Sequence, residues 1–150
     1  MGANLSGGNY IVDSVTLLHN SASSIAASAY GLVDGSINTI DTGSSTDVYR
    51  GELIIDVSAI LTTAGNGVTF ILQGANTSFS TDIVNLATLP LGDVTLLTLQ
   101  TADSVTGRYI VPFTNEVPLG TVKRYLRLYM LVVASGTCTY TAFLSKAKAL

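Results

Sequence analysis

Short apolar runs, each of strand length and each closed by turn-forming residues, are the feature that most limits what this chain can fold into. They recur every 8–15 residues with Gly, Asn, Asp and Pro between them, and no stretch carries a convincing amphipathic helical pattern. Short strands at such spacing are typical of β-sandwiches and barrels. The sequence therefore predicts an all-β chain of seven to nine strands that forms a single-domain jelly roll or antiparallel β-sandwich.

Two of the predicted strands follow each other across a short glycine-containing link. Arg50 to Ile60 and Val68 to Gln73 both alternate apolar and polar residues, and Gly65-Asn66-Gly67 lies between them. Tight links of this composition usually join antiparallel neighbours. We therefore expect the two segments to form an antiparallel pair. Further strands are expected at Val94 to Leu99 and at Tyr109 to Phe113.

The stretch from Val122 to Val133 combines a strand pattern with positive charge. Its even positions are mostly aliphatic, whereas its odd positions begin Lys-Tyr-Arg-Tyr. Because side chains alternate between the two faces of a strand, we expect Leu126, Leu128 and Met130 to face the core. Tyr and Arg are favoured as anchors at protein interfaces. The residues predicted to contact a partner are Lys123, Arg124, Tyr125, Arg127 and Tyr129.

Two alternatives stay open for these side chains. In the first, Tyr125 and Tyr129 are ordinary half-buried strand residues with no partner. In the second, Arg124 lies on the inward side of its strand and pairs with a buried acid, which gives it a structural role.

The two ends of the chain contain few residues that could anchor them. Residues 1–9 are small and glycine-rich, and Leu5 is their main anchoring side chain. We expect a flexible N-terminal arm over residues 1–9, one β-sandwich domain over residues 10–145 and a tail over residues 146–150. Because such an arm often reaches a neighbouring subunit, Leu5 and Tyr10 are predicted as further partner-contact residues.

Charge is scarce in this chain. Charged residues make up 11% of the sequence, against about 25% in an average soluble domain, and the mean hydropathy is +0.47. Permanent interfaces are more apolar and poorer in charge than free surfaces, so lasting contacts with other subunits would explain this composition. The longest strongly apolar run without charge, Leu128 to Ala134, is too short to cross a bilayer, and no membrane partner is expected.

No residue pattern for catalysis is visible. His19 is the single histidine and Cys138 the single cysteine, and no Gly-x-Ser-x-Gly turn is present to hold a nucleophile. This pair cannot supply the three or four ligands of a zinc site, and a solvated turn is a better interpretation of Asp41 and Asp47 than a calcium site. A pI near 4.7 is unlike that of nucleic-acid-binding proteins. We expect no enzyme, no cofactor, no metal and no nucleic-acid partner.

The last part of the chain carries a set of short motifs. In order they read Pro118-Leu119-Gly120, Arg124-Tyr125-Leu126-Arg127-Leu128 and Thr141-Ala142-Phe143-Leu144. With them the chain resembles the Bbp16-type capsid cement proteins of tailed bacteriophages, roughly from Asn9 to Ser145. The link Ala134-Ser135-Gly136 is shorter than expected of that family.

The resemblance implies a jelly-roll subunit that binds the outer surface of an icosahedral capsid and connects neighbouring copies of the major capsid protein. It also implies assembly with other copies of itself, as a dimer or a trimer. The protein would be made in the bacterial host cytoplasm and would end on the outside of the virion.

A second class of function is a carbohydrate- or receptor-binding β-sandwich of a phage appendage. Sugar sites usually rest on an exposed aromatic platform. Because the chain has no Trp, that platform would have to come from Tyr30, Tyr49 or Tyr140.

Overall fold

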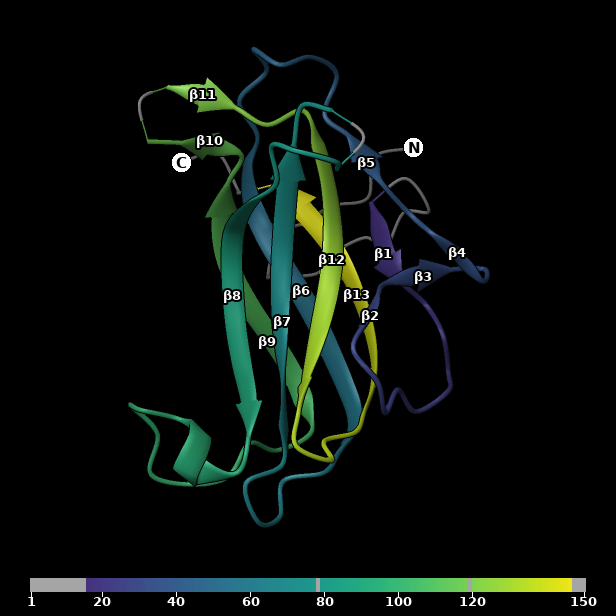
Figure 1. Cartoon of the computed structure of the whole chain (residues 1–150), viewed down its shortest axis with the longest axis vertical. Helices are drawn as coiled ribbons and strands as arrows, with labels where there is room; N and C mark the ends of the chain where they lie inside the picture. The colour runs from purple at the N-terminus through teal and green to yellow at the C-terminus, as the bar shows by residue number, and fades with distance from the viewer. Residues whose placement is uncertain (1–15, 78, 119, 147–150) are drawn as a thin grey trace, which may run out of the picture.

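The computed structural model describes residues 16–77, 79–118 and 120–146, and its regular secondary structure is almost entirely antiparallel β-strand (Figure 1). The long strands are β6 (Arg50–Ile60), β7 (Gly67–Ala75), β8 (Val84–Gly92), β9 (Gly107–Thr114), β12 (Tyr125–Val133) and β13 (Cys138–Lys146). The short ones are β1 (Leu17–His19), β2 (Ala29–Tyr30), β3 (Leu32–Val33), β4 (Ser36–Ile37), β5 (Ile40–Asp41), β10 (Glu116–Val117) and β11 (Thr121–Val122). A 3₁₀ turn, η1 (Val94–Leu96), follows β8.

Two antiparallel sheets lie face to face. The first sheet has the strand order β1-β13-β6-β9, and the second has the order β2-β12-β7-β8 with β5 as a further partner of β12. In Figure 1, β7, β8 and β12 lie in front of β6, β9 and β13. The predicted all-β fold and antiparallel β-sandwich are thus confirmed. The finer assignment to a jelly roll stays a prediction, and the strand order is compatible with it.

The core lies between the sheets and is built from alternate residues of the long strands. Leu126, Leu128 and Met130 of β12 are at most 1% exposed, as their spacing predicts. Phe70 and Leu72 of β7 are fully buried in the same cluster. Burial of each such side chain contributes about 1.5–3 kcal/mol. This shared apolar layer therefore holds the sheets together.

Strands β6 and β7 do not pair with each other, so the predicted antiparallel pair across Gly65-Asn66-Gly67 is wrong. β6 pairs with β13 and β9, whereas β7 pairs with β12 and β8. The link between them carries the chain from one sheet to the other. It is fastened by Asp93, whose carboxylate accepts from the Gly65 N–H and whose N–H donates to the Asn66 carbonyl at 3.0 Å. A glycine-containing link thus predicts a change of direction but not the next pairing partner.

The strand predicted at Val94 to Leu99 is also wrong, because this segment forms η1 and the loop after it. The Asp93 carboxylate accepts a hydrogen bond from the Thr95 N–H at 2.9 Å. Side-chain bonds of this kind compete with the ladder of a sheet and favour a turn. The loop leaves Leu99 94% exposed at its tip.

Candidate functional site

The outer face of the second sheet carries aromatic, aliphatic and polar side chains and very little charge. The odd positions of β12 point outwards, where Tyr125, Arg127 and Tyr129 are half-buried and Leu131 is 41% exposed. Directly opposite these positions on the neighbouring strands lie Gln73, Ile71 and Thr69 of β7, and Tyr30 of β2. Side chains that face each other across a ladder share one face of the sheet. We call this surface the Arg127 face.

The Arg127 guanidinium lies between two aromatic rings. Its central carbon is 4.1 Å from the ring centroid of Tyr30 and 4.1 Å from that of Phe79. Nε donates to the Gln73 side-chain oxygen at 3.0 Å, and Nη2 donates to the Tyr30 hydroxyl at 3.1 Å. The Tyr129 ring packs against Tyr30 with the centroids 5.0 Å apart. Cation–π contact and hydrogen bonding together fix the guanidinium in one orientation.

Phe79 reaches this position through a strained backbone. Its φ is 56°, a left-handed conformation that is uncommon for a bulky residue. The loop is held by the Asp82 carboxylate, which accepts from the Thr77 hydroxyl at 2.6 Å and from the Asn76 N–H at 2.6 Å. These two hydrogen bonds, in that order, lower the pKa of Asp82 to about 2. Strained residues of this kind often mark functional sites, and they persist only where the surroundings hold them.

Lys123 does not lie on the Arg127 face, and its expected position there is wrong. The residue is 7% exposed, and its Nζ lies 3.4 Å from Oδ2 of Asp82. A buried ammonium needs such a carboxylate partner. Lys123 therefore supports the loop that carries Phe79.

The backbone explains why the alternation does not extend to Lys123. The predicted strand from Val122 to Val133 is interrupted, because β11 ends at Val122 and β12 begins at Tyr125. In the gap, the Lys123 N–H donates to the Asn115 carbonyl at 2.9 Å rather than to a strand neighbour. The period of two therefore restarts at Tyr125.

Arg124 forms a two-pronged ion pair with Asp41. Nε donates to Oδ1 at 2.7 Å and Nη2 donates to Oδ2 at 2.8 Å, with the side chains 37% and 45% exposed. The alternative of a buried acid partner is thus wrong, although Arg124 does pair with a carboxylate. This bond and the Gly43 N–H lower the pKa of Asp41 to about 2. Leu5 and Tyr10, the other two predicted contact residues, lie outside the described part of the chain.

A cleft opens beside Arg127, near the ends of β5, β7 and β12 at the top of Figure 1. Its volume is about 430 Å³. The residues that line it are Thr39, Asn76, Thr77, Phe79, Tyr125 and Arg127.

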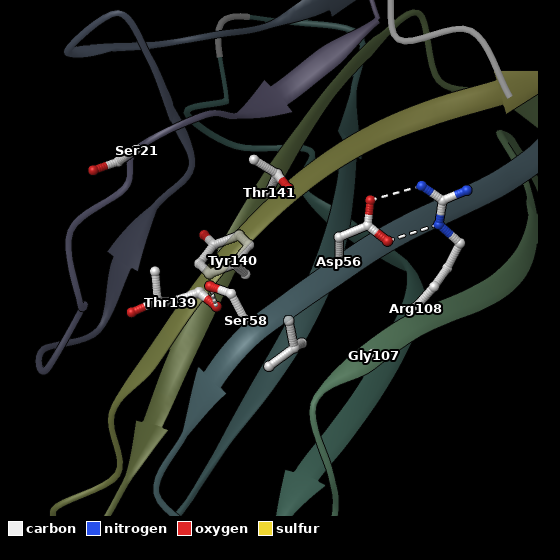
Figure 2. Close-up of a pocket in the computed structure, with 9 residues that line it drawn as sticks. Ser21, Asp56, Ser58, Gly107, Arg108, Thr139, Tyr140 and Thr141 are labelled. Atoms are coloured by element: carbon white, nitrogen blue, oxygen red, sulfur yellow. Dashed lines mark hydrogen bonds and ion pairs between the residues drawn. The ribbon is translucent and has the colours of Figure 1, made fainter.

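Figure 2 shows a smaller depression, of about 290 Å³, on the outer face of the first sheet. Arg108 pairs with Asp56 there through Nε at 2.7 Å and Nη2 at 2.8 Å, so the two charges satisfy each other. The Ser58 hydroxyl donates to the Thr139 carbonyl at 3.2 Å. Tyr140 also lines the depression but is only 2% exposed, so it offers no open ring face.

His19 is a packing residue in this structure. It is 1% exposed, and its ring stacks on that of Tyr140 with the centroids 4.1 Å apart. Nδ1 accepts from the Leu32 N–H at 3.0 Å, while Nε2 has no hydrogen-bond partner in the part of the chain that the structure describes. Burial lowers the pKa of His19 to about 4 and raises the pKa of the Cys138 thiol to about 12.

Sequence reasoning missed the residues that organise the Arg127 face. Phe79 lies in the polar stretch GANTSFST at residues 74–81, which carries no strand pattern, and the sequence predicts Tyr30 only as part of a sugar platform. Both rings come to Arg127 from segments distant in the sequence. The alternation in β12 indicates that Arg127 points outwards but gives no sign of what covers it.

A comparison with models of protein families and with curated proteins found no match to this chain. Residues 16–77, 79–118 and 120–146 contain no group of three or more His, Cys, Asp or Glu side chains that could hold a metal ion. Within the same described ranges, no helix has the length and the apolar character that crossing a lipid bilayer requires.

Proposed function

We propose that this chain is a structural virion protein that binds the outer surface of an icosahedral phage capsid and connects adjacent major capsid proteins. The observation that carries the proposal is the Arg127 face, where tyrosines and aliphatic side chains surround one fixed guanidinium. Tyr and Arg are enriched in the anchors of protein interfaces, and interface centres are depleted of other charged residues. The low overall charge and the resemblance to capsid cement proteins favour the same function.

Such a protein would act by stabilising the assembled capsid shell rather than by catalysing a reaction. A subunit that binds the assembled shell but not its separate parts shifts the equilibrium towards the shell by mass action. Copies that join as dimers or trimers would engage several capsid proteins at once, and avidity would then exceed the affinity of each contact.

Replacing Arg127 or Tyr129 by alanine is expected to weaken binding to capsid shells by about tenfold or more, because each change removes an interface anchor. Binding would be measured by co-sedimentation of the purified chain with shells assembled without it. The matched control is Arg50→Ala, whose side chain is 73% exposed and belongs to the other sheet. Thermal melting would show whether each variant is folded. Normal decoration of shells by both folded variants would show that the Arg127 face is not the capsid-binding surface.

The carbohydrate- or receptor-binding alternative has less support from the geometry. Tyr140 is buried, and one face of the Tyr30 ring is covered by the Arg127 guanidinium. Tyr49 is half-buried and stacks on Phe113 with the centroids 5.6 Å apart. A glycan array tests this alternative directly, and a specific signal there without shell binding would favour it.

A further inference from the structure

Arg127 differs from the other cationic side chains that the structure describes. Each of those pairs with a carboxylate. The pairs are Arg50 with Glu116, Arg108 with Asp56, Lys123 with Asp82 and Arg124 with Asp41. Among the described residues, Arg127 has only neutral partners, Gln73 and Tyr30. Its positive charge is therefore held in place without a counter-charge.

The guanidinium keeps unused donors on the side away from these two partners. A guanidinium has five N–H donors in one plane, and the hydrogen bonds to Gln73 and Tyr30 occupy one on Nε and one on Nη2. Both hydrogens of Nη1 and the second hydrogen of Nη2 have no hydrogen-bond partner among the residues that the structure describes. One hydrogen of Nη1 and the second hydrogen of Nη2 form a planar fork that matches the two oxygens of a carboxylate. The rings of Tyr30 and Phe79 keep the fork from turning.

The surroundings favour a singly charged planar anion. The carboxylates at this end of the sheet are already satisfied, Asp41 by Arg124 and Asp82 by Lys123 and Thr77, so none of them has to be displaced. A phosphate carries more charge and is usually met by several cations or by a helix N-terminus. The cleft offers one free cation among the described residues, together with the hydroxyl-bearing residues Thr39, Thr77 and Tyr125.

We infer that the cleft at Arg127 binds the carboxylate of an acidic side chain that a partner protein inserts between Phe79 and Tyr125. A protein partner is favoured over a free acid or an acidic sugar because the cleft continues into the Arg127 face, whose tyrosines and exposed Leu131 suit an apolar protein surface. The identity of the partner rests on the proposed function. The binding of a carboxylate in the cleft does not depend on it.

The cleft can be tested without any shell. The amide signals of Gln73 and Tyr129 would be followed by NMR during titration with a blocked tripeptide that has a central glutamate, and with its glutamine counterpart. We expect saturable shifts with the glutamate peptide and at least about tenfold weaker binding of the glutamine peptide, because hydrogen bonds to charged groups are the stronger kind. Arg127→Lys, which keeps the charge but loses the planar fork, should weaken binding about tenfold, whereas Arg50→Gln should not change it.

Several results would overturn the inference. Equal shifts with both peptides, no saturable shift, or unchanged binding in Arg127→Lys would each exclude a carboxylate fork at this position. Inorganic phosphate or N-acetylneuraminic acid binding more tightly than the glutamate peptide would assign the cleft to a phosphate or to an acidic glycan instead.

Co-sedimentation with shells separates the inference from the proposed function. If the unmodified chain binds shells and Arg127→Lys binds about tenfold less, the capsid protein supplies the acidic side chain. If the unmodified chain does not bind shells, the proposed function fails, while the peptide titration still decides the chemistry of the cleft. Shell binding that is unaffected by Arg127→Lys would overturn the use of this cleft for the capsid.

Discussion

Replacing Asn115 by alanine is expected to lower the free energy of unfolding by about 3–4 kcal/mol, because three backbone groups lose their partner together. Asn115 is 0% exposed. Its Oδ1 accepts from the Tyr49 N–H at 2.6 Å, and its Nδ2 donates to the carbonyls of Asp47 at 3.0 Å and Lys123 at 2.9 Å. One side chain thus joins the segment before β6, the end of β9 and the segment before β12.

Urea denaturation would measure this loss. Asn85→Ala is the matched control, because Asn85 lies exposed on β8 and should change the free energy of unfolding by less than about 0.5 kcal/mol. Asn115→Asp keeps the acceptor for the Tyr49 N–H but removes both donors, so it should be destabilising as well. A loss below about 1 kcal/mol for Asn115→Ala would mean that water replaces the amide in all three bonds.

Lowering the pH from 7 to 4 is expected to cost the fold about 2–3 kcal/mol through His19 alone. Burial lowers the folded-state pKa of this residue from 6.5 to about 4. The unfolded chain therefore binds a proton below pH 6.5 that the folded chain resists. The stability due to the neutral ring is fully present above pH 6.5 and declines as the pH falls towards 4.

The comparison that isolates this effect is the pH dependence of the melting temperature in the original chain and in His19→Gln. The variant should be less stable at pH 7 but should lose less stability between pH 6.5 and 4. Asp41 and Asp82 affect this window little, because their pKa values fall from 3.8 in the unfolded chain to about 2 in the folded chain, and their contribution is lost mainly below pH 4. Parallel profiles for the two proteins would contradict a role for His19 in acid sensitivity.

The regular parts of the fold could be predicted from the sequence because they depend on a local period of two. β6 has the predicted bounds Arg50 to Ile60, and the inward face of β12 from Leu126 to Met130 follows the alternation. Strand pairing could not be predicted in the same way. The link after β6 has the composition of a hairpin turn. Only the packing of the two sheets decides that β7 joins the second sheet instead of pairing with β6.

In the candidate site, too, the local strand pattern could be predicted from the sequence and the contacts between distant segments could not. Tyr125, Arg127 and Tyr129 share an outer face because their spacing requires it. The burial of Lys123 depends on Asp82, and the clamp on Arg127 depends on Phe79, so both arise from contacts between distant segments. The presence of a charged or aromatic residue in a loop does not by itself indicate which strand its side chain will contact.

The buried thiol of Cys138 makes the chain convenient for attaching probes. This cysteine is the only one in the sequence, and burial raises its pKa to about 12, so almost none of it is thiolate at neutral pH. A maleimide dye should therefore leave the native chain unlabelled. Leu99, 94% exposed at the loop tip beyond η1, could be changed to cysteine to give one reactive position. A donor dye there, with an acceptor dye on the partner, would report the distance to a partner bound at the Arg127 face by energy transfer.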